Sequence, residues 1–549
     1  MKRTLLFAAT AILLQTCGSG SGDKSSENKR VFRYNETGGI NSLDPAAANK
    51  SENIWAVNQV FNGLVQLDDQ LKVIPSIAKS WELYDDGREY TFHLRNDVYF
   101  QDDACFPDGR GRKVTADDFV QSFYRLMELK SERSSMPIFK LLERSERTNF
   151  IGFTAPNDST FKIFLDKPFP PFLEILSMHY FSVVPHEAAD KYGEDFGRHP
   201  VGTGPFKFKV WDEGQKLVLV RNENYFEKEG GQRLPYLEAV DISFIKDNEI
   251  AFTEFLKGNF DMISGTETIN KKMVLDPSGG LTGTYKGKFV LQTGPYLKTD
   301  YLGILVDPRM EIVKESPLHL KEVRQAINYA IDREKIINYL RYGIGTPALS
   351  GFIPEGLPSF DKNKVKGYHY DPDKSRELLR KAGYGDKDKM PEIELNVAAQ
   401  YADMSNFIKK ELEDVGFRIK ININQNSVQS TLVGSSRVNF FRKSWVGDYA
   451  DAQDFFSIFY SKNFSPEGSN YFHFANDEFD KLYEQACAEP SDSVRYGLYQ
   501  RMDNILMEES PVVPLFYDEF LRLVQNDVEG LTTNPMNLLN LKRVKKKAE

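Results

Sequence analysis

The stretch "PVGTGPFKFKVW" (200–211) joins a turn rich in Gly and Pro to a run that alternates basic and apolar residues. Gly202 and Gly204 could suggest a phosphate-binding loop, but such loops continue with Lys and then Ser or Thr, and this one does not. The residues "KFKVW" that follow are typical of a strand instead. We therefore predict a tight, buried turn that leads into a β-strand.

Strand and helix patterns alternate on both sides of this turn. "EYTFHLR" (89–95) and "KLVLVRN" (216–222) are β-rich runs bounded by turn residues, so each predicts a strand. Apolar residues recur at helical spacing in 320–343, 370–384 and 476–487. The chain is therefore predicted to have an α/β fold.

The predicted helices also carry their own boundary signals. Asp371 is a good N-cap for the second of them, and Gly383 ends it. Gly343 ends the first, and Asn476 or Asp477 caps the third. These boundaries support the α/β assignment and carry no information about function.

Length and composition describe a large globular protein. A chain of 549 residues exceeds one ordinary core, because single domains typically hold about 100–200 residues, so we expect two to four domains. Its 70 basic and 79 acidic residues give a net charge of −9, which disfavours binding to a nucleic acid backbone. Aromatic residues make up 13% of the chain, a share that suits recognition surfaces as well as cores.

The N-terminus is typical of a secreted protein. Residues 1–17 hold a basic start, an apolar run too short to span a bilayer and the ending "LLQTC" at Cys17. This ending resembles a bacterial lipoprotein cleavage box, whose Cys becomes the lipid-bearing first residue of the mature chain; a plain secretory signal is the alternative. Residues 18–30 are rich in Gly and Ser and predict a flexible tether. We therefore expect a protein that a lipid on Cys17 anchors to a membrane.

The other two cysteines do not define a site. Cys105 and Cys487 lie far apart in sequence, and an extracytoplasmic compartment leaves a disulfide between them open. No pair of cysteines, and no combination of Cys and His, has the spacing of a zinc site. The sequence thus predicts no structural zinc.

A loop rich in Gly, Pro and Asp precedes a helix that is predicted to begin near Thr115. Asp102, Asp103 and Asp108 lie in this loop and could bind a cation. They lack a regular spacing of oxygen ligands such as that of an EF-hand. We therefore predict a solvated loop.

The stretch "FFRKSWVGDYADAQDFF" (440–456) places three carboxylates inside an aromatic run. Asp448, Asp451 and Asp454 are spaced by three, so they could serve as a catalytic pair, a metal site or a charged anchor for a ligand. No His-Glu-x-x-His or Gly-x-Ser-x-Gly sequence accompanies them. We predict no enzymatic activity, no cofactor and no metal, and expect Asp451 and Asp454 to cap or solvate the helix that follows.

Several stretches together resemble the extracytoplasmic solute-binding proteins of family 5, the oligopeptide- and dipeptide-binding proteins of peptide-type ABC importers. They follow in order from residue 31 to about 520: "SLDPAAANKSENIWAVNQVFNGLVQLD" (42–68), "PSIAKSWELYDDGREYTFHLRNDVYF" (75–100) with "VTADDFVQSFYRL" (114–126), "PVGTGPFKFKVW" with "LVLVRNENYF" (217–226), "EVRQAINYAIDREKIINYLRYGIGTPA" (322–348), "YDPDKSRELLRKAGY" (370–384), "WVGDYADAQDFF" (445–456) and "SPVVPLFY" (510–517).

This resemblance implies a fold of the periplasmic binding protein type II kind, with two lobes, a hinge and an additional inserted domain. The implied divisions are domain I from 30–60, 185–290 and 515–549, domain II from 61–184, and domain III from 291–514. Because the chain would cross between the lobes more than once, paired strands would form the hinge and let the lobes close over a ligand.

The resemblance also implies a ligand site. In peptide-binding members, the acidic residue of the Asp-Tyr pair after the Trp points into the cleft and pairs with the ligand's ammonium group, and here that residue is Asp448. Arg442 lies where some members hold an Arg near the ligand carboxylate, while Lys443 would face outward. The remaining expected contacts come from two segments: Ser444, Trp445, Val446, Gly447 and Tyr449 on one side, and Ala48, Asn49, Lys50 and Ser51 on the other.

The implied function is that of a monomeric receptor that carries peptides to ABC permease subunits. It would lie outside the cytoplasm, attached to a bacterial membrane through Cys17. The same fold with another ligand, such as a nickel chelate, haem, a sugar or an antibiotic, stays open, as does a surface hydrolase that uses the Asp cluster.

Overall fold

The computed structural model describes residues 30–129, 137–145, 150–265 and 268–547. These residues form one sheet of eleven strands and several small sheets. In spatial order the large sheet holds β10 (Phe206–Asp212), β11 (Lys216–Arg221), β14 (Ala239–Ser243), β1 (Val31–Asn35), β15 (Met262–Ser264), β21 (Val512–Gln525), β16 (Phe289–Ile304), β20 (Phe440–Val446), β18 (Glu392–Ala398) and β19 (Arg418–Asn424), with β17 (Thr346–Pro347) on β21.

A second sheet lies within residues 61–184. It has the order β4 (Ala78–Tyr84), β5 (Glu89–Leu94), β9 (Thr160–Phe164) and β8 (Phe153–Asn157). The described chain also forms two-stranded pairs: β2 (Val65–Leu67) with β3 (Val73–Pro75), β6 (Arg144–Ser145) with β7 (Phe150–Ile151), β12 (Lys228–Glu229) with β13 (Gln232–Arg233), and β22 (Val528–Glu529) with β23 (Lys545–Lys546).

Helices cover these sheets. They are α2 (Ser51–Val60), α3 (Ala116–Glu128), α4 (Pro137–Leu141), α5 (Phe172–Leu176), α6 (His186–Tyr192), α7 (Asn248–Leu256), α8 (Lys271–Val274), α9 (Glu311–Lys314), α10 (Lys321–Ala330), α11 (Arg333–Lys335), α12 (Pro372–Lys381), α13 (Ala402–Val415), α14 (Asn426–Gly434), α15 (Ala452–Ser457), α16 (Asp477–Ala488) and α17 (Asp492–Glu509). Among them, none combines the length and the apolar character that crossing a membrane requires.

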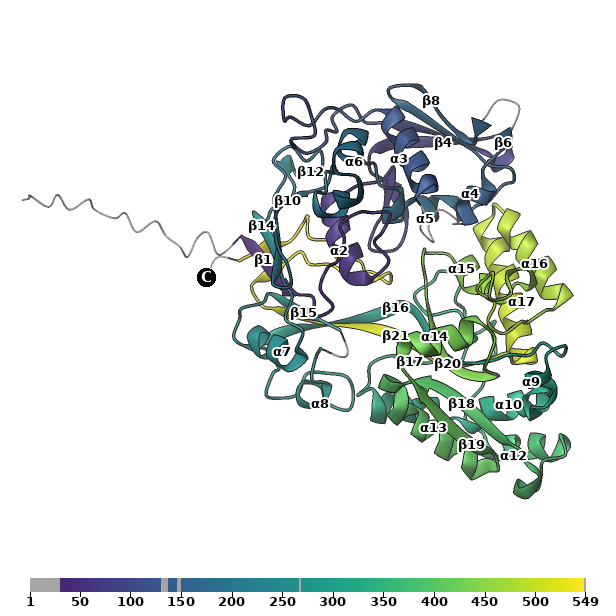
Figure 1. Cartoon of the computed structure of the whole chain (residues 1–549). Coiled ribbons are helices and arrows are strands. Elements are labelled where there is room, and N and C mark those ends of the chain that lie inside the picture. The colour runs from purple at the N-terminus through teal and green to yellow at the C-terminus, as the bar shows by residue number, and fades with distance from the viewer. Residues whose placement is uncertain (1–29, 130–136, 146–149, 266–267, 548–549) are drawn as a thin grey trace, which may run out of the picture.

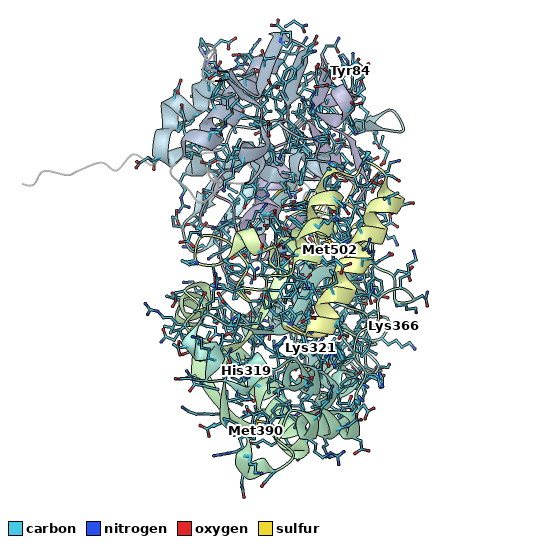
Figure 2. The ribbon with its side chains drawn as sticks, turned by 90° about the vertical axis from the view of Figure 1, so that its right-hand side faces the viewer. Tyr84, His319, Lys321, Lys366, Met390 and Met502 are labelled. Atoms are coloured by element: carbon cyan, nitrogen blue, oxygen red, sulfur yellow. The ribbon has the colours of Figure 1, made fainter. Side chains whose placement is uncertain are left out.

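The molecule is elongated, and its hydrophobic core is divided. Figure 2 places Tyr84 of β4 near one end and Met390, which precedes β18, near the other, with Met502 of α17 between them. One buried cluster joins residues 32–244 to the C-terminal segment, and two others draw mostly on residues 297–516. The separate cores fit an architecture of more than one domain, as expected for a chain of this length.

The molecule has two bodies, one around the core of residues 32–244 and the other around the cores of residues 297–516. β16 and β21 run from one body into the other (Figure 1). Their pairing is regular up to Pro295 opposite Glu519 and resumes at Thr299 opposite Tyr517, so the register breaks midway. At this break, Lys298 Nζ lies 2.6 Å from Asp518 Oδ2, and Arg341 also pairs with Asp518. These cations hold the pKa of the buried Asp518 carboxyl below its usual value, against the effect of burial.

The predicted turn at 200–206 is present. The Gly204 N–H donates to the Val60 carbonyl at 2.7 Å, at the end of α2. A Cβ atom on Gly202 would lie 2.2 Å from the same oxygen, so only Gly allows this approach. β10 follows from Phe206, which confirms the predicted turn and strand.

Most predicted boundaries are confirmed, because they depend on local hydrogen bonds. The predicted strands at 89–95 and 216–222 are β5 and β11. The side chains of Asp371 and Asn476 accept the N–H groups of Lys374 and Phe479, at the starts of α12 and α16. Thr115 forms a capping box with Asp118 at the start of α3.

The single helix predicted over 320–343 is wrong, because the chain leaves α10 after Ala330. Asp332 starts α11 by accepting the Lys335 N–H at 3.0 Å, and its own N–H donates to Glu411 at 2.6 Å. Arg333, 1% exposed, donates from its guanidinium to the carbonyl oxygens of Asn328 and Pro514. These tertiary bonds compete with a continuous helix, although the apolar spacing is compatible with one.

The loop before α3 is held by its own side chains. Asp103 accepts the Cys105 N–H at 2.7 Å and the Tyr192 hydroxyl at 2.7 Å, while Asp102 accepts the Gly111 N–H at 2.9 Å. In the described ranges, no three His, Cys, Asp or Glu side chains are grouped to hold a metal ion. Cys105 and Cys487 are both free thiols, so they do not form a disulfide with each other.

Candidate functional site

The two segments expected to bind the ligand meet near the register break of β16. The Gly447 N–H donates to the Leu297 carbonyl at 2.8 Å, and the Ser51 side chain lies beside that of Tyr296. The end of β20 and the start of α2 therefore flank two consecutive residues of β16. Residues that are about 400 positions apart in the chain thus share one region.

β20 presents an open edge in this region. β16 pairs with every residue from Phe440 to Val446, but on the other side β18 pairs only with Phe440 and Phe441. Within the described ranges, no strand pairs with that second edge of residues 442–446. The backbone groups there are those to which an extended chain adds as a further strand.

Asp454 organises the residues around Asp448. Its Oδ2 accepts two hydrogen bonds, from Trp445 Nε1 at 3.0 Å and from the Asp448 N–H at 3.0 Å. Asp454 is 4% exposed, whereas the Asp448 side chain is exposed. Burial, with the nearby charge of Asp448, raises the pKa of Asp454 well above its usual value.

Asp451 starts α15, as predicted. Its side chain accepts the Gln453 N–H at 2.8 Å, and the same oxygen accepts the Tyr499 hydroxyl at 2.6 Å. Arg495 of α17 lies 3.4 Å from the other oxygen. Asp454 does not cap or solvate the helix as predicted, because it is buried and bonded to Trp445 and Asp448.

Arg442 is paired within the protein. Its guanidinium forms a two-pronged ion pair with Asp300 of β16, with Nε 3.0 Å from Oδ1, and stacks on Tyr401 with the ring centroid 3.2 Å away. Arg442 is 6% exposed and Asp300 is fully buried. A ligand carboxylate at Arg442 would therefore share the guanidinium with Asp300, and this role stays a prediction.

The other predicted residues differ in their exposure. Val446 is exposed and Ser444 and Trp445 are half-buried, whereas Gly447 is buried. Tyr449 packs against the core of the other body and donates to Gln453. Lys443 is half-buried, with Nζ 4.6 Å from the Tyr471 ring centroid, so it does not project freely outward.

The segment 48–51 is exposed except at its first residue. Asn49, Lys50 and Ser51 are exposed, and Lys50 is the N-cap residue of α2. Ala48 is fully buried, and its carbonyl lies 2.6 Å from His179 Nε2. A pocket of about 110 Å³ opens nearby beside Gln59, Asn62 and His179, and none of the predicted ligand residues lines it.

Sequence reasoning did not identify Asp300, Tyr296 and Tyr401, and it gave Asp454 a different role. Tyr401, Tyr296 and Asp300 touch the site only because distant segments meet. A signal for Asp300 exists in "LKTDYLGI" (297–304), where an acidic residue interrupts an otherwise strand-like run. Such a charge needs a partner when it is buried, but the sequence does not say which one.

Comparison with known proteins identifies the family. The model for bacterial extracellular solute-binding proteins, family 5, matches residues 72–467. The chain is 28% identical to heme-binding protein A of Haemophilus influenzae over 97% of both chains. It is 25% identical to the oligopeptide-binding protein OppA of Bacillus subtilis, over 94% of this chain and 93% of that one.

Solved structures agree on the fold. A TM-score of 0.78 relates the chain to HbpA2 from Haemophilus parasuis, with 22% identity over 94% of this chain and all of the other. The periplasmic binding protein DppA from Helicobacter pylori in complex with the peptide STSA gives 0.75, with 23% identity over 95% of this chain and all of the other. These likenesses confirm the predicted mixed α/β, multi-domain fold of the type II kind. The chain belongs to the bacterial extracellular solute-binding proteins of family 5.

Proposed function

We propose that this protein binds peptides between its two lobes and delivers them to the permease subunits of an ABC importer. The observation that carries the proposal is the carboxylate of Asp448, exposed beside Trp445 at the open edge of β20, on a loop that Asp454 holds in place. A peptide supplies a group for each of these features.

The peptide's ammonium group would pair with Asp448. An ammonium group that loses its hydrating water needs a charged hydrogen-bonding partner. An exposed carboxylate on a fixed backbone can provide this partner with little rearrangement of the protein. Asp454, with its raised pKa, adds less negative charge than a second ionised carboxylate would. Trp445 would form a flat wall beside the first residue of the peptide.

The peptide's backbone would add to the edge of residues 442–446 as a strand, with Asn49, Lys50 and Ser51 facing it from the segment that leads into α2. Main-chain bonding does not depend on side chains, so this mode accepts many sequences. Water between the pocket walls and the ligand's side chains would add further tolerance. At the far end, Arg442 would donate to the carboxylate from Nη1, which takes no part in its two bonds to Asp300.

The N-terminal signals support an anchored receptor. Residues 1–29, including Cys17, lie outside the described residues, so acylation of Cys17 is proposed from the sequence alone. A lipid there would keep the binding protein beside its permease. Replacement of Cys17 by Ala should release the protein from the membrane fraction, which detergent partitioning would measure.

Asp448→Ala tests the ammonium anchor. Isothermal titration with an unmodified tripeptide should show a loss of about 3 kcal/mol, which is about a hundredfold in Kd, because the buried ammonium would lose its partner. Acetylation of the peptide's N-terminus should cost the wild-type protein a similar amount. Asp373→Ala, whose side chain is 92% exposed on α12, serves as the control and should bind normally. Unchanged affinity in Asp448→Ala would remove the anchor from the proposal.

A non-peptide solute is the second candidate, because a relative that is 28% identical over 97% of both chains is named a heme-binding protein. Mass spectrometry of whatever denaturation releases from freshly purified protein separates the two candidates. A mixture of short peptides supports the proposal. Haem, a metal chelate or a sugar would replace it with the second candidate.

A further inference from the structure

A second site lies far from the interlobe region, on the face that carries β1 and β14. An open pocket of about 380 Å³ is lined by the side chains of Arg30, Arg221, Gln232, Arg233, Tyr236, Leu237, Lys545 and Lys546. Five of these residues are cationic, and the lining contains no carboxylate. β1 and β14 lie at the margin of the molecule opposite α16 and α17 (Figure 1).

Four separate segments build this pocket. Arg221 ends β11, Arg233 lies in β13 and Lys545 in β23, while Arg30 directly precedes β1. Backbone bonds fix two of them together, since the Glu238 N–H donates to the Arg30 carbonyl at 2.9 Å and the Arg221 N–H donates to the Glu238 carbonyl at 2.8 Å. The convergence of these cations therefore follows from the fold.

Carboxylates around the pocket neutralise only some of its charge. Arg30 pairs with Glu238 at 2.7 Å, and Lys546 pairs with Asp261 at 2.7 Å. Within the described part of the chain, neither Arg233 nor Lys545 has a carboxylate oxygen within 4.0 Å; Lys545 Nζ instead lies 3.9 Å from the Tyr236 ring centroid. Arg233 donates to the Tyr225 carbonyl, and the charges of Asp97 and Glu229 act on Arg233 and Lys545 from a greater distance. These two cations are therefore only partly neutralised.

The guanidinium of Arg221 is also incompletely bonded. Its Nε is buried without a hydrogen-bond partner, and oxygens of Glu223 and Glu238 lie 3.5 Å and 3.9 Å from the guanidinium. One Nη donates to the Arg233 carbonyl at 3.4 Å. Several partly neutralised cations within a single pocket favour an anion that offers several acceptor oxygens. The planar fork of Arg matches phosphate oxygens in pairs, while Lys supplies a point charge.

We propose that this pocket binds a phosphate group, with Arg233, Lys545 and Arg221 as its ligands. The phosphate could belong to a lipid headgroup or to a soluble phosphate ester, and the chemistry of recognition is the same for both. The inference is independent of what the interlobe region binds.

The test compares two double variants of the whole protein. Arg233→Gln with Lys545→Gln removes two charges from the pocket, and Arg437→Gln with Lys366→Gln removes the same two charge types from exposed positions elsewhere. Binding of glycerol 3-phosphate by calorimetry, and sedimentation with vesicles of phosphatidylglycerol or of phosphatidylcholine, are measured for both and for the wild-type protein. The single variant Lys545→Gln, at an exposed side chain, covers the case in which Arg233→Gln impairs folding.

We expect the pocket variant to lose about tenfold or more in affinity for phosphate, while the control stays at the wild-type value. Loss that is confined to phosphatidylglycerol vesicles would identify a lipid headgroup, and loss with glycerol 3-phosphate would identify a soluble ester. Equal behaviour of the pocket and control variants in both assays would overturn the proposal. Peptide binding, measured on the same preparations, should be the same in all of them, so failure of either proposal is seen separately.

Discussion

A single buried carboxyl group positions the residues that we propose for ligand recognition. Asp454 joins the indole of Trp445 and the backbone of Asp448 through one oxygen, so it fixes both the wall and the charge of the site. It has no need to touch the ligand. Its contribution is to limit the conformations of the loop before a ligand arrives, which lowers the entropy cost of binding.

We predict that Asp454→Ala weakens peptide binding by about 1–3 kcal/mol, because Trp445 Nε1 and the Asp448 N–H lose their acceptor. Asp454→Asn keeps an acceptor oxygen and should retain most of the affinity. Calorimetry on the two variants measures the difference. Equal losses in both would mean that the charge of Asp454, and not its hydrogen bonds, supports the site.

At the scale of elements, α17 is tied to the loop at 351–353 by a buried acid. Asp503, 1% exposed, accepts the Phe352 N–H at 2.7 Å and the Ile353 N–H at 3.3 Å. Burial raises the pKa of Asp503 to about 7, and the two backbone bonds only partly offset this effect. The folded state therefore holds a proton that the unfolded state releases near the ordinary pKa of Asp.

The raised pKa of Asp503 predicts that the protein becomes less stable as pH rises. Between about pH 4 and pH 7 the folded state binds more protons than the unfolded state, so the free energy of unfolding falls over that window, by up to about 4 kcal/mol from this group. Asp503→Asn should flatten that part of the curve in urea unfolding at pH 5 and pH 8. Asp492→Asn, at a side chain 69% exposed on the same helix, should keep the wild-type slope.

Elements whose boundaries depend on neighbouring residues were predictable from sequence, and those set by distant partners were not. The caps Asp371 and Asn476 act within three residues, and the turn at Gly204 is signalled by its own glycines. The break after Ala330 depends instead on Glu411 and on Pro514, which no local pattern reveals.

For the candidate site, too, the sequence predicted some features and not others. The resemblance to family 5 identified the two segments that the structure brings to Tyr296 and Leu297. The partners of charged residues inside the site could not be predicted from sequence, since the partner of Arg442 lies 142 residues away. A charge on a strand predicts that a partner exists and leaves its identity open.

At the scale of the whole molecule, the two bodies meet where α5 faces α15 and α17 (Figure 1). Burial and the nearby charge of Asp451 together raise the pKa of Glu174 to about 7, although the charge of Arg495 acts in the opposite direction. Tyr449, in the loop before α15, packs against the core of the body that contains α5. Glu174 is thus an acid whose protonation depends on the contact between the bodies.

We predict that ligand-free protein opens as pH rises. In the described arrangement Glu174 holds its proton up to about pH 7, whereas exposure would restore the ordinary pKa near 4.5, so the contact binds more protons and is favoured at low pH. Each pH unit within this window shifts the equilibrium by at most about tenfold. Small-angle X-ray scattering should show a larger radius of gyration at pH 8 than at pH 5.

Glu174→Gln should remove most of this dependence, because the amide does not titrate. Glu143→Gln, at an exposed position of the same body, should keep it. Identical scattering curves for the two variants across the pH range would assign the opening to other groups.

The path of β21 has a consequence for biosynthesis. Residues 512–525 supply a strand that pairs with β15, β16 and β17, near the middle of the large sheet. The ribosome must therefore synthesise more than nine-tenths of the 549-residue chain before this sheet can be completed. Pairings between residues so far apart form slowly, and they leave an unfinished chain with exposed apolar strands. During that interval the nascent protein exposes apolar surface to chaperones.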